Sequence, residues 1–328
     1  MNWNLLSKYR SELMGLATIA VVLFHFFEEV GQHASEVTDT VLHLYNFGRY
    51  GYIGVEVFLI VSGIGCYYSI RKNFNKKEFY KKRAKRILIP YLLIAVPFWL
   101  YIDVFLNKSI EEFIYDLTGI SFLIDTKTFW YVFFILIMYF LFPLIYKFLF
   151  GKEKDIFLKF MFIELLVAFL TIILYVEMYD VFDLIEIALT RVPIFIFGVY
   201  TGHKVYNNEK VSFPILFFSI FSIFLINIDF DNQLVMRYIN SVQSIGFSLI
   251  MVKIFDIVNL KNINRFLSFV GKYSFEIYLL HIAFRRVFDS LDIRPYEWNN
   301  YLMIILLTVL FTWLVQLVTN TKSKKVYK

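Results

Sequence analysis

The chain has 328 residues, of which 59% are hydrophobic, 20% aromatic and only 18% charged. Its mean hydropathy is +0.62. A soluble core of this length does not need so much apolar surface, so the composition excludes an ordinary soluble protein and predicts an all-α, polytopic membrane protein. The formal net charge of +6 comes from Lys and Arg between hydrophobic runs, which indicates membrane topology rather than nucleic-acid binding.

The first 25 residues resemble a secretion signal, because Lys8 and Arg10 precede an apolar run. They have no small-x-small cleavage site, and Phe26 and Phe27 continue the apolar segment. We therefore expect an uncleaved first helix that starts at its charged end and carries His25 deep inside it.

Ten segments are long and apolar enough to span a bilayer, which takes about 20 residues of helix. Connections between them do not exceed about 23 residues, so we expect a single transmembrane domain over residues 1–328 without an appended soluble domain. The predicted spans are residues 12–30, 51–70, 87–106, 128–149, 156–176, 186–203, 211–228, 238–258, 266–287 and 298–320.

The connections alternate in charge along the chain. The connection from Arg71 to Arg86 holds nine Lys or Arg residues, whereas acidic residues such as Glu111, Glu112 and Asp116 dominate the alternate connections. About two dozen of the 33 Lys and Arg residues fall on one side, so the positive-inside rule predicts that both termini lie in the cytoplasm.

Four polar residues are expected at nearly one depth in the outer part of the membrane. His25, Glu56, Arg191 and His281 each lie about five residues from the outer end of a predicted helix, and a helix rises ~1.5 Å per residue. An ionisable residue at membrane depth costs free energy, so a functional site is the first hypothesis. A carboxylate, an arginine and two histidines in one layer fit a proton-transfer site.

Two structural alternatives stay open for this layer. His25 can instead be an interior histidine that hydrogen-bonds a backbone carbonyl. Glu56 and Arg191 can form a buried ion pair that ties two helices together, a role that does not exclude the site.

Two cations stand directly before an apolar segment on the predicted inner side. Lys82 and Arg86 are four residues apart, which puts both on one face of a helix at the membrane surface. Two cations in this position can hold a phosphate or pyrophosphate. A basic inner loop that only sets topology and contacts anionic lipid is the alternative.

Aromatic and metal-binding signals are weaker. Trp130 stands at the outer mouth of a predicted helix, where its ring can belong to the aromatic belt or stack on a sugar. We expect no metal, since Cys66 is the single cysteine and the chain has no His-Glu-x-x-His motif.

With these residues placed, the chain resembles the membrane-bound acyltransferase 3 family from end to end. The likeness depends on five motifs in the right order and spacing. They are Glu12-Leu-Met-Gly-Leu-Ala through His25, Gly51-Tyr-Ile-Gly-Val-Glu-Val-Phe-Leu-Ile-Val-Ser-Gly63, Phe79-Tyr-Lys-Lys-Arg-Ala-Lys-Arg-Ile-Leu-Ile-Pro-Tyr91, Arg191-Val-Pro-Ile-Phe-Ile-Phe-Gly198 and Gly271-Lys-Tyr-Ser-Phe-Glu-Ile-Tyr-Leu-Leu-His281.

The resemblance implies ten core helices and transfer of an acyl group, often acetyl, from cytoplasmic acyl-CoA. It implies acceptors such as sugars of surface polysaccharides, glycolipids or peptidoglycan. By the same resemblance His25 matches the essential histidine, Glu56 the acidic position of a Gly-Val-Asp/Glu motif, and Lys82 with Arg86 the basic pair.

One position departs from the family pattern. The family usually has Arg or Lys eleven residues before the histidine, where this chain has Met14. Arg10 lies one turn earlier on roughly the same helix face, so we expect it to take over this cation's role. Arg10 and His25 are then ~22 Å apart along the helix, so one end can hold the coenzyme phosphates while the other handles the acyl group.

Together with these observations, the resemblance implies an O-acyltransferase, with acetyl as the expected group, in the cytoplasmic membrane of a bacterium. His25 would act as general base or carry the acyl group transiently, and Glu56 would orient it. Trp130, Arg191 and His281 are the candidates for contacts with substrate. Expected partners are acyl-CoA, a carbohydrate or glycolipid acceptor, membrane lipid and polysaccharide-synthesis proteins.

Two other classes of protein are also compatible with a buried polar layer of this kind. A transporter or flippase for a glycan would use it as a permeation site, although the absence of an internal repeat weakens this interpretation. A non-catalytic membrane component of a polysaccharide-synthesis complex is the other possibility. Consumption of acyl-CoA separates the enzyme from both.

Overall fold

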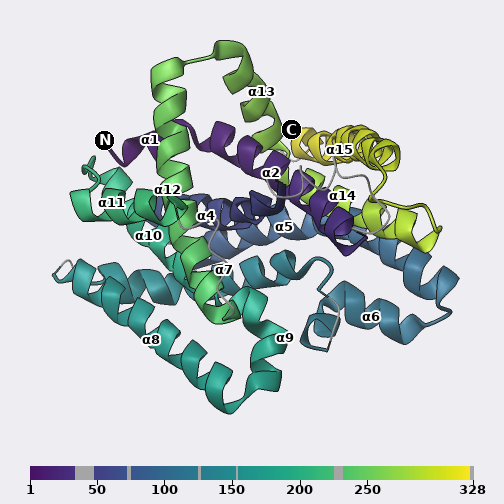
Figure 1. The fold of residues 1–328 in the computed structure, drawn as a ribbon, viewed down its shortest axis with the longest axis horizontal. Coiled ribbons are helices and arrows are strands. Elements are labelled where there is room, and N and C mark those ends of the chain that lie inside the picture. The colour runs from purple at the N-terminus through teal and green to yellow at the C-terminus, as the bar shows by residue number, and fades with distance from the viewer. Residues whose placement is uncertain (34–47, 72–74, 125–126, 153, 225–231, 326–328) are drawn as a thin grey trace. The chain divides into compact units, whose positions relative to one another are not determined.

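The structure is a computed structural model that describes residues 1–33, 48–71, 75–124, 127–152, 154–224 and 232–325, with side chains as far as residue 319. In these ranges the chain is helical, and the only β-type pairing is an isolated bridge between Asn2 and Lys210 (Figure 1). The all-α prediction is therefore confirmed for the described residues.

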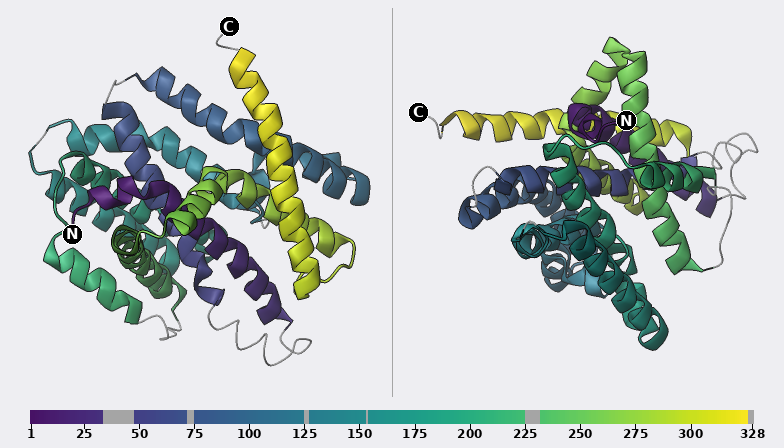
Figure 2. Two further views of the ribbon diagram at one scale, coloured as in Figure 1. Left: turned by 90° about the horizontal axis from the view of Figure 1, so that it is seen from above. Right: turned by 90° about the vertical axis from the view of Figure 1, so that its left-hand side faces the viewer.

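Seven of the described helices are long and apolar enough to cross a membrane. They coincide with seven predicted spans, and the last of them, α15, is a single long helix in Figure 2. They are α2 (Arg10–Gln32), α4 (Ile53–Arg71, with the 3-10 turn η2, Arg49–Tyr52, before it), α5 (Lys76–Trp99, continued by the π-helix η3, Leu100–Leu106), α7 (Trp130–Phe150), α8 (Ile156–Glu177), α12 (Gln233–Val258) and α15 (Trp298–Lys325).

The other three predicted spans coincide with shorter helices. Residues 186–203 are divided between α9 (Tyr179–Leu189) and α10 (Val192–Tyr206), because Pro193 in the first turn of α10 suits the start of a new helix. Residues 211–228 contain α11 (Phe213–Phe224) and then extend beyond the described residues. Residues 266–287 are divided at Tyr273 between α13 (Lys261–Lys272) and α14 (Ser274–Ser290).

The predicted outer connection between α5 and α7 forms a short helix of its own. This helix, α6 (Ile110–Thr118), starts at Ser109, whose side chain accepts a hydrogen bond from the backbone N–H of Glu112. It ends at Gly119, which has the left-handed backbone (φ 77°) that a helix C-cap favours, and the 3-10 turn η4 (Ile120–Leu123) follows.

The described residues pack as two compact units, each made of several stretches of chain. Unit 1 comprises residues 1–17, 53–81 and 134–272, and unit 2 comprises residues 18–52, 82–133 and 273–328. The prediction of one transmembrane domain stays a prediction. Unit 1 contains α1 (Asn4–Lys8), the starts of α2 and α5, α4, most of α7, and α8 to α13. Unit 2 contains the rest of α2, most of α5, the first residues of α7, and α6, α14 and α15.

In unit 1, α4 packs tightly against α10. A Cβ atom on Gly63 would lie 2.6 Å from the carbonyl oxygen of Phe195, and one on Gly198 would lie 2.6 Å from that of Ile60. The two glycines therefore permit direct backbone contact, which is typical of helix pairs in membranes.

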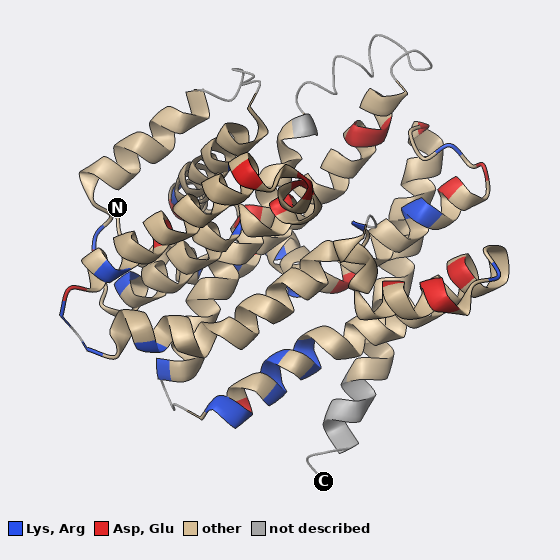
Figure 3. Ribbon diagram, turned by 90° about the horizontal axis from the view of Figure 1, so that it is seen from below, with Lys and Arg blue, Asp and Glu red and all other residues tan. Residues whose placement is uncertain are grey.

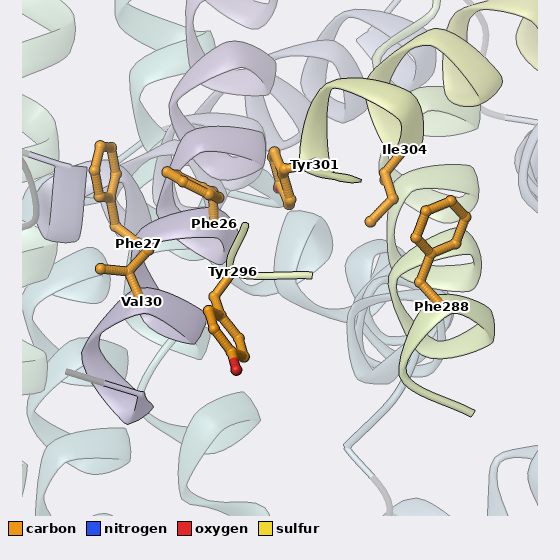
Figure 4. Close-up of a cluster of buried hydrophobic side chains, with 7 residues drawn as sticks. All are labelled: Phe26, Phe27, Val30, Phe288, Tyr296, Tyr301 and Ile304. Atoms are coloured by element: carbon orange, nitrogen blue, oxygen red, sulfur yellow. The ribbon is translucent and has the colours of Figure 1, made fainter. Parts of the chain in front are cut away.

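In unit 2, an aromatic cluster fixes α2 against the chain's last two helices. Tyr301 donates a hydrogen bond from its hydroxyl to the carbonyl oxygen of Val22, and its ring packs on Phe26. The cluster in Figure 4 consists of Phe26, Phe27, Val30, Phe288, Tyr296, Tyr301 and Ile304. This packing holds the segment of α2 that carries His25.

Candidate functional site

Unit 2 contains a pair of histidines on two different helices. His25 is half-buried on α2, and His281 is 1% exposed on α14. The Nδ1 atom of His25 lies 2.8 Å from Nε2 of His281, and the two rings are stacked with their centroids 5.0 Å apart. The two histidines that the sequence placed at one depth are therefore hydrogen-bonded partners.

A backbone carbonyl fixes the proton positions in this pair. Nδ1 of His281 lies 2.9 Å from the carbonyl oxygen of Ile277, which can only accept a hydrogen bond. With both rings neutral, His281 therefore carries its proton on Nδ1 and accepts at Nε2 from the Nδ1–H of His25. The Nε2 atom of His25 then keeps a free lone pair, as a general base requires.

An ion-pair cluster lies one helical turn beyond the histidines in the same unit. Arg285 on α14 contacts Glu28 at 3.2 Å and Glu29 at 3.3 Å on α2. The cluster was missed in the sequence, although a signal was present. Arg285 follows His281 by four residues, and Glu29 follows His25 by the same interval, so equal spacing on two helices predicts a second contact.

Unit 1 contains a buried ion pair between Glu56 on α4 and Arg191, which lies directly before α10. Glu56 Oε1 is 2.9 Å from Arg191 Nε, and both side chains are almost fully buried. The Arg191 guanidinium also donates to the carbonyl oxygen of Ile187 at 2.8 Å. The helix-tying contact that the sequence left open is therefore present.

A second ion pair in unit 1 was not anticipated. Arg237 on α12 binds Glu186 on α9 through two hydrogen bonds, 2.9 Å from Nε and 2.7 Å from Nη2. Glu186 is 2% exposed, so this fork-shaped contact neutralises a buried carboxylate. No spacing in the sequence links two residues that are 51 positions apart.

The predicted Glu56–His25 contact joins residues of different units. Glu56 is described in unit 1 and His25 in unit 2. The proposed orientation of His25 by Glu56 therefore stays a prediction. Within unit 2, the group that hydrogen-bonds His25 is His281.

The three predicted donor-binding cations are all exposed. Arg10 is the first residue of α2, whereas Lys82 and Arg86 lie one turn apart on the continuous helix α5. Figure 3 shows Lys and Arg gathered along the first turns of α5. The shared helical face of Lys82 and Arg86 is confirmed, and their role in binding a ligand stays a prediction.

Trp130 is the first residue of α7 and is half-buried, with its ring centroid 6.0 Å from that of Tyr131. Its predicted contact with a sugar stays a prediction, as do the substrate contacts of Arg191 and His281. Among the described residues, no group of three His, Cys, Asp or Glu side chains is placed to hold a metal ion.

These features define a class of protein: a multi-pass membrane protein with a hydrogen-bonded histidine pair inside its helices. The acyltransferase 3 family model, described as an acyltransferase domain, matches residues 13–319. Because the match covers nearly the whole chain, the chain belongs to this family and is a membrane acyltransferase. Searches of curated proteins and of solved structures found no match.

Proposed function

We propose that this enzyme moves an acyl group, expected to be acetyl, from cytoplasmic acyl-CoA to a hydroxyl of a cell-surface polysaccharide, glycolipid or precursor sugar. The bacterial cytoplasmic membrane is the proposed location. The family match supports acyl transfer, and the observation that carries the proposal is the hydrogen bond between His25 and His281, which leaves His25 Nε2 free to take a proton.

The chemical step uses this nitrogen as a general base. As the acceptor hydroxyl oxygen attacks the thioester carbonyl, its proton passes to His25 Nε2. The new C–O bond forms and the C–S bond breaks, after which the proton passes from Nε2 to the leaving thiolate. The products are the O-acyl ester and free coenzyme A, and His25 returns to its starting tautomer.

His281 is the positioning residue in this proposal. It accepts the Nδ1–H of His25 while Ile277 fixes its own tautomer, so it orients the base as a carboxylate does in a catalytic triad. Its Nε2 also stabilises the positive charge that develops on His25 during proton transfer. The contacts of Arg285 with Glu28 and Glu29 keep the two helices in register.

The donor is expected at the other end of α2. Coenzyme A carries several phosphate charges, which Arg10, Lys82 and Arg86 are suited to bind. Fifteen residues separate Arg10 from His25 on one helix, or ~22 Å along its axis. The long pantetheine arm of coenzyme A links the phosphates to the thioester carbonyl. It therefore allows the phosphates to bind near Arg10 while the carbonyl reaches His25 at a different depth in the membrane.

The first test is the substitution His25→Ala in native membranes, which contain the endogenous acceptor. Thiol release from acetyl-CoA should fall by at least about 100-fold at unchanged protein abundance, because the general base is lost. His33→Ala is the matched control, since His33 stacks on Tyr296 and takes no part in the proposed chemistry. Normal thiol release by His25→Ala would remove His25 from the mechanism.

A second arm of the same assay tests the donor site. Lys82→Ala combined with Arg86→Ala should raise the KM for acetyl-CoA by about tenfold or more, because charge-assisted hydrogen bonds to phosphate are lost. Lys76→Ala with Lys77→Ala removes the same charge from the same helix and should leave this KM nearly unchanged. Equal KM values for acetyl-CoA in the two double variants would mean that Lys82 and Arg86 do not bind the coenzyme and that the basic residues of α5 only set the membrane topology.

A further inference from the structure

Unit 2 contains a cavity of about 520 Å³ that is lined by the end of α5, by η3, α6 and the end of α14. We call it the acidic cavity, because four of its lining residues carry carboxyl groups and one carries a guanidinium. These five residues are Asp103, Glu112, Asp116, Asp289 and Arg286.

Asp103 is the residue that points to a ligand. It is 1% exposed, and its Oδ2 atom is buried with no hydrogen-bond donor among the described residues. A buried acceptor without a partner costs free energy, which a ligand's donor group would recover. Asp103 also lies in the π-helix η3, a rare conformation that is frequent at functional sites.

Carboxyl groups outnumber cationic groups by four to one in the lining of the acidic cavity. Glu112 accepts a hydrogen bond from the side-chain amide of Asn107 at 3.1 Å. In the described part of the chain these carboxylates do not form a group that could hold a metal ion, so an organic ligand fits them better.

Aromatic side chains complete the lining. Trp99, which is 4% exposed, and Tyr115 both line the acidic cavity. A flat ring offers packing surface to the apolar face of a sugar, while carboxylates accept hydrogen bonds from its hydroxyls. The lining thus combines aromatic rings with polar groups that converge on one space, as small-molecule sites do.

The acidic cavity and the histidine pair share one helix. Asp289 lies eight residues after His281 on α14, or ~12 Å along the axis. A short oligosaccharide spans this distance, so one of its sugars can occupy the cavity while another approaches His25.

We propose that the acidic cavity is the acceptor subsite, and that it selects sugars that present hydroxyl or ammonium donors and carry no negative charge. This inference rests on the proposed function, from which it takes the assumption that the acceptor is a carbohydrate. The carboxyl groups of the lining repel anionic sugars and accept hydrogen bonds from hydroxyl or ammonium groups. The acidic cavity therefore selects its sugar both by excluding anions and by binding donors.

Binding of three matched probes to the full-length protein in lipid nanodiscs tests this inference. The probes are methyl β-glucoside, its 2-amino derivative and the corresponding glucuronide, with affinities measured by saturation-transfer NMR titration. The wild-type protein should bind the amino sugar most tightly, and should bind the glucuronide at least about tenfold more weakly than the neutral glucoside.

Asp103→Asn should weaken binding of the amino sugar by about tenfold and narrow the difference in affinity between the glucoside and the glucuronide, since one carboxyl oxygen is replaced by an amide NH2 donor at nearly constant shape. Glu297→Gln removes an exposed acid of unit 2 outside the cavity and should change neither. Asp289 is exposed, so Asp289→Asn should leave folding intact. This substitution should also narrow the difference in affinity between the glucoside and the glucuronide.

Three results would overturn the inference: no binding of any probe, equal wild-type affinity for the glucuronide and the glucoside, or unchanged selectivity in both Asp103→Asn and Asp289→Asn. Thiol release from acetyl-CoA in native membranes is measured in parallel. If that release depends on His25 while the selectivity is absent, the subsite is wrong and the proposed function stands. If the selectivity is present and no release depends on His25, the proposed function fails.

Discussion

Within unit 2, the imidazole of His25 is hydrogen-bonded to another imidazole, that of His281. A carboxylate would bring a full negative charge into the membrane, whereas His281 offers a neutral acceptor whose tautomer is fixed by the carbonyl of Ile277. This arrangement gives His25 a free Nε2 without an additional buried charge. The proposed chemistry therefore depends on His281 as an acceptor, and not only as a packed ring.

Substitution of His281 tests this role. His281→Leu removes the acceptor and should lower kcat for thiol release by about 100-fold, with little change in the KM for acetyl-CoA. His281→Gln provides an amide oxygen that can accept the hydrogen bond from Nδ1–H of His25, so its kcat should fall by only about tenfold. Equal losses in the two variants, at equal protein abundance, would mean that His281 acts only through packing.

The sequence predicts a depth in the membrane for each site residue, but it does not predict which residues are partners. Residue counts from helix ends place His25, Glu56, Arg191 and His281 at one level. Depth does not specify which helices are neighbours, and the observed pairs are His25 with His281 and Glu56 with Arg191. The unpartnered oxygen of Asp103 is likewise invisible in sequence, because it depends on how η3 packs.

At the scale of helices, hydrophobic runs predicted the long elements and missed the breaks. The seven long helices follow continuous apolar stretches that need no partner to be recognised. The predicted spans 186–203 and 266–287 each contain a break, at Thr190 and Arg191 in the first and at Tyr273 in the second. Hydropathy averaged over a window does not register one or two non-helical residues.

The crossing of α4 and α10 yields a prediction of stability. Gly198→Val should lower the melting temperature of the detergent-solubilised protein by about 5 °C or more, because the added carbons collide with the backbone of α4. Gly198→Ala should cause a smaller loss in the same direction. The measurement is thermal unfolding followed by size-exclusion chromatography.

The control for this prediction adds volume where no helix is in contact. Val176 on α8 is 65% exposed, so Val176→Leu should leave the melting temperature unchanged. If Gly198→Val melts at the same temperature as Val176→Leu, close backbone contact does not stabilise the α4–α10 pair.

Across the whole chain, basic and acidic residues concentrate in different segments, as expected for an enzyme that we propose binds its two substrates on opposite sides of the membrane. Basic residues gather at the start of α5, where the coenzyme phosphates are expected. Acidic residues gather in the connection that contains α6, where we propose the acceptor binds. The proposed donor site thus lies in a basic connection and the proposed acceptor site in an acidic one. The same uneven distribution of Lys and Arg between connections predicts that the termini are cytoplasmic.

In the proposed reaction, His25 is the general base for transfer of an acyl group from coenzyme A to a sugar hydroxyl. The most direct measurement adds acetyl-CoA with a labelled acetyl group to membranes that contain either the wild-type protein or His25→Ala at equal abundance. We predict that the wild-type membranes accumulate label in the saccharide fraction as an alkali-labile ester, and that His25→Ala membranes do not. Equal labelling of the two membranes would show that His25 is not needed for the transfer, and wild-type label that resists alkali would show that the product is not an O-acyl ester.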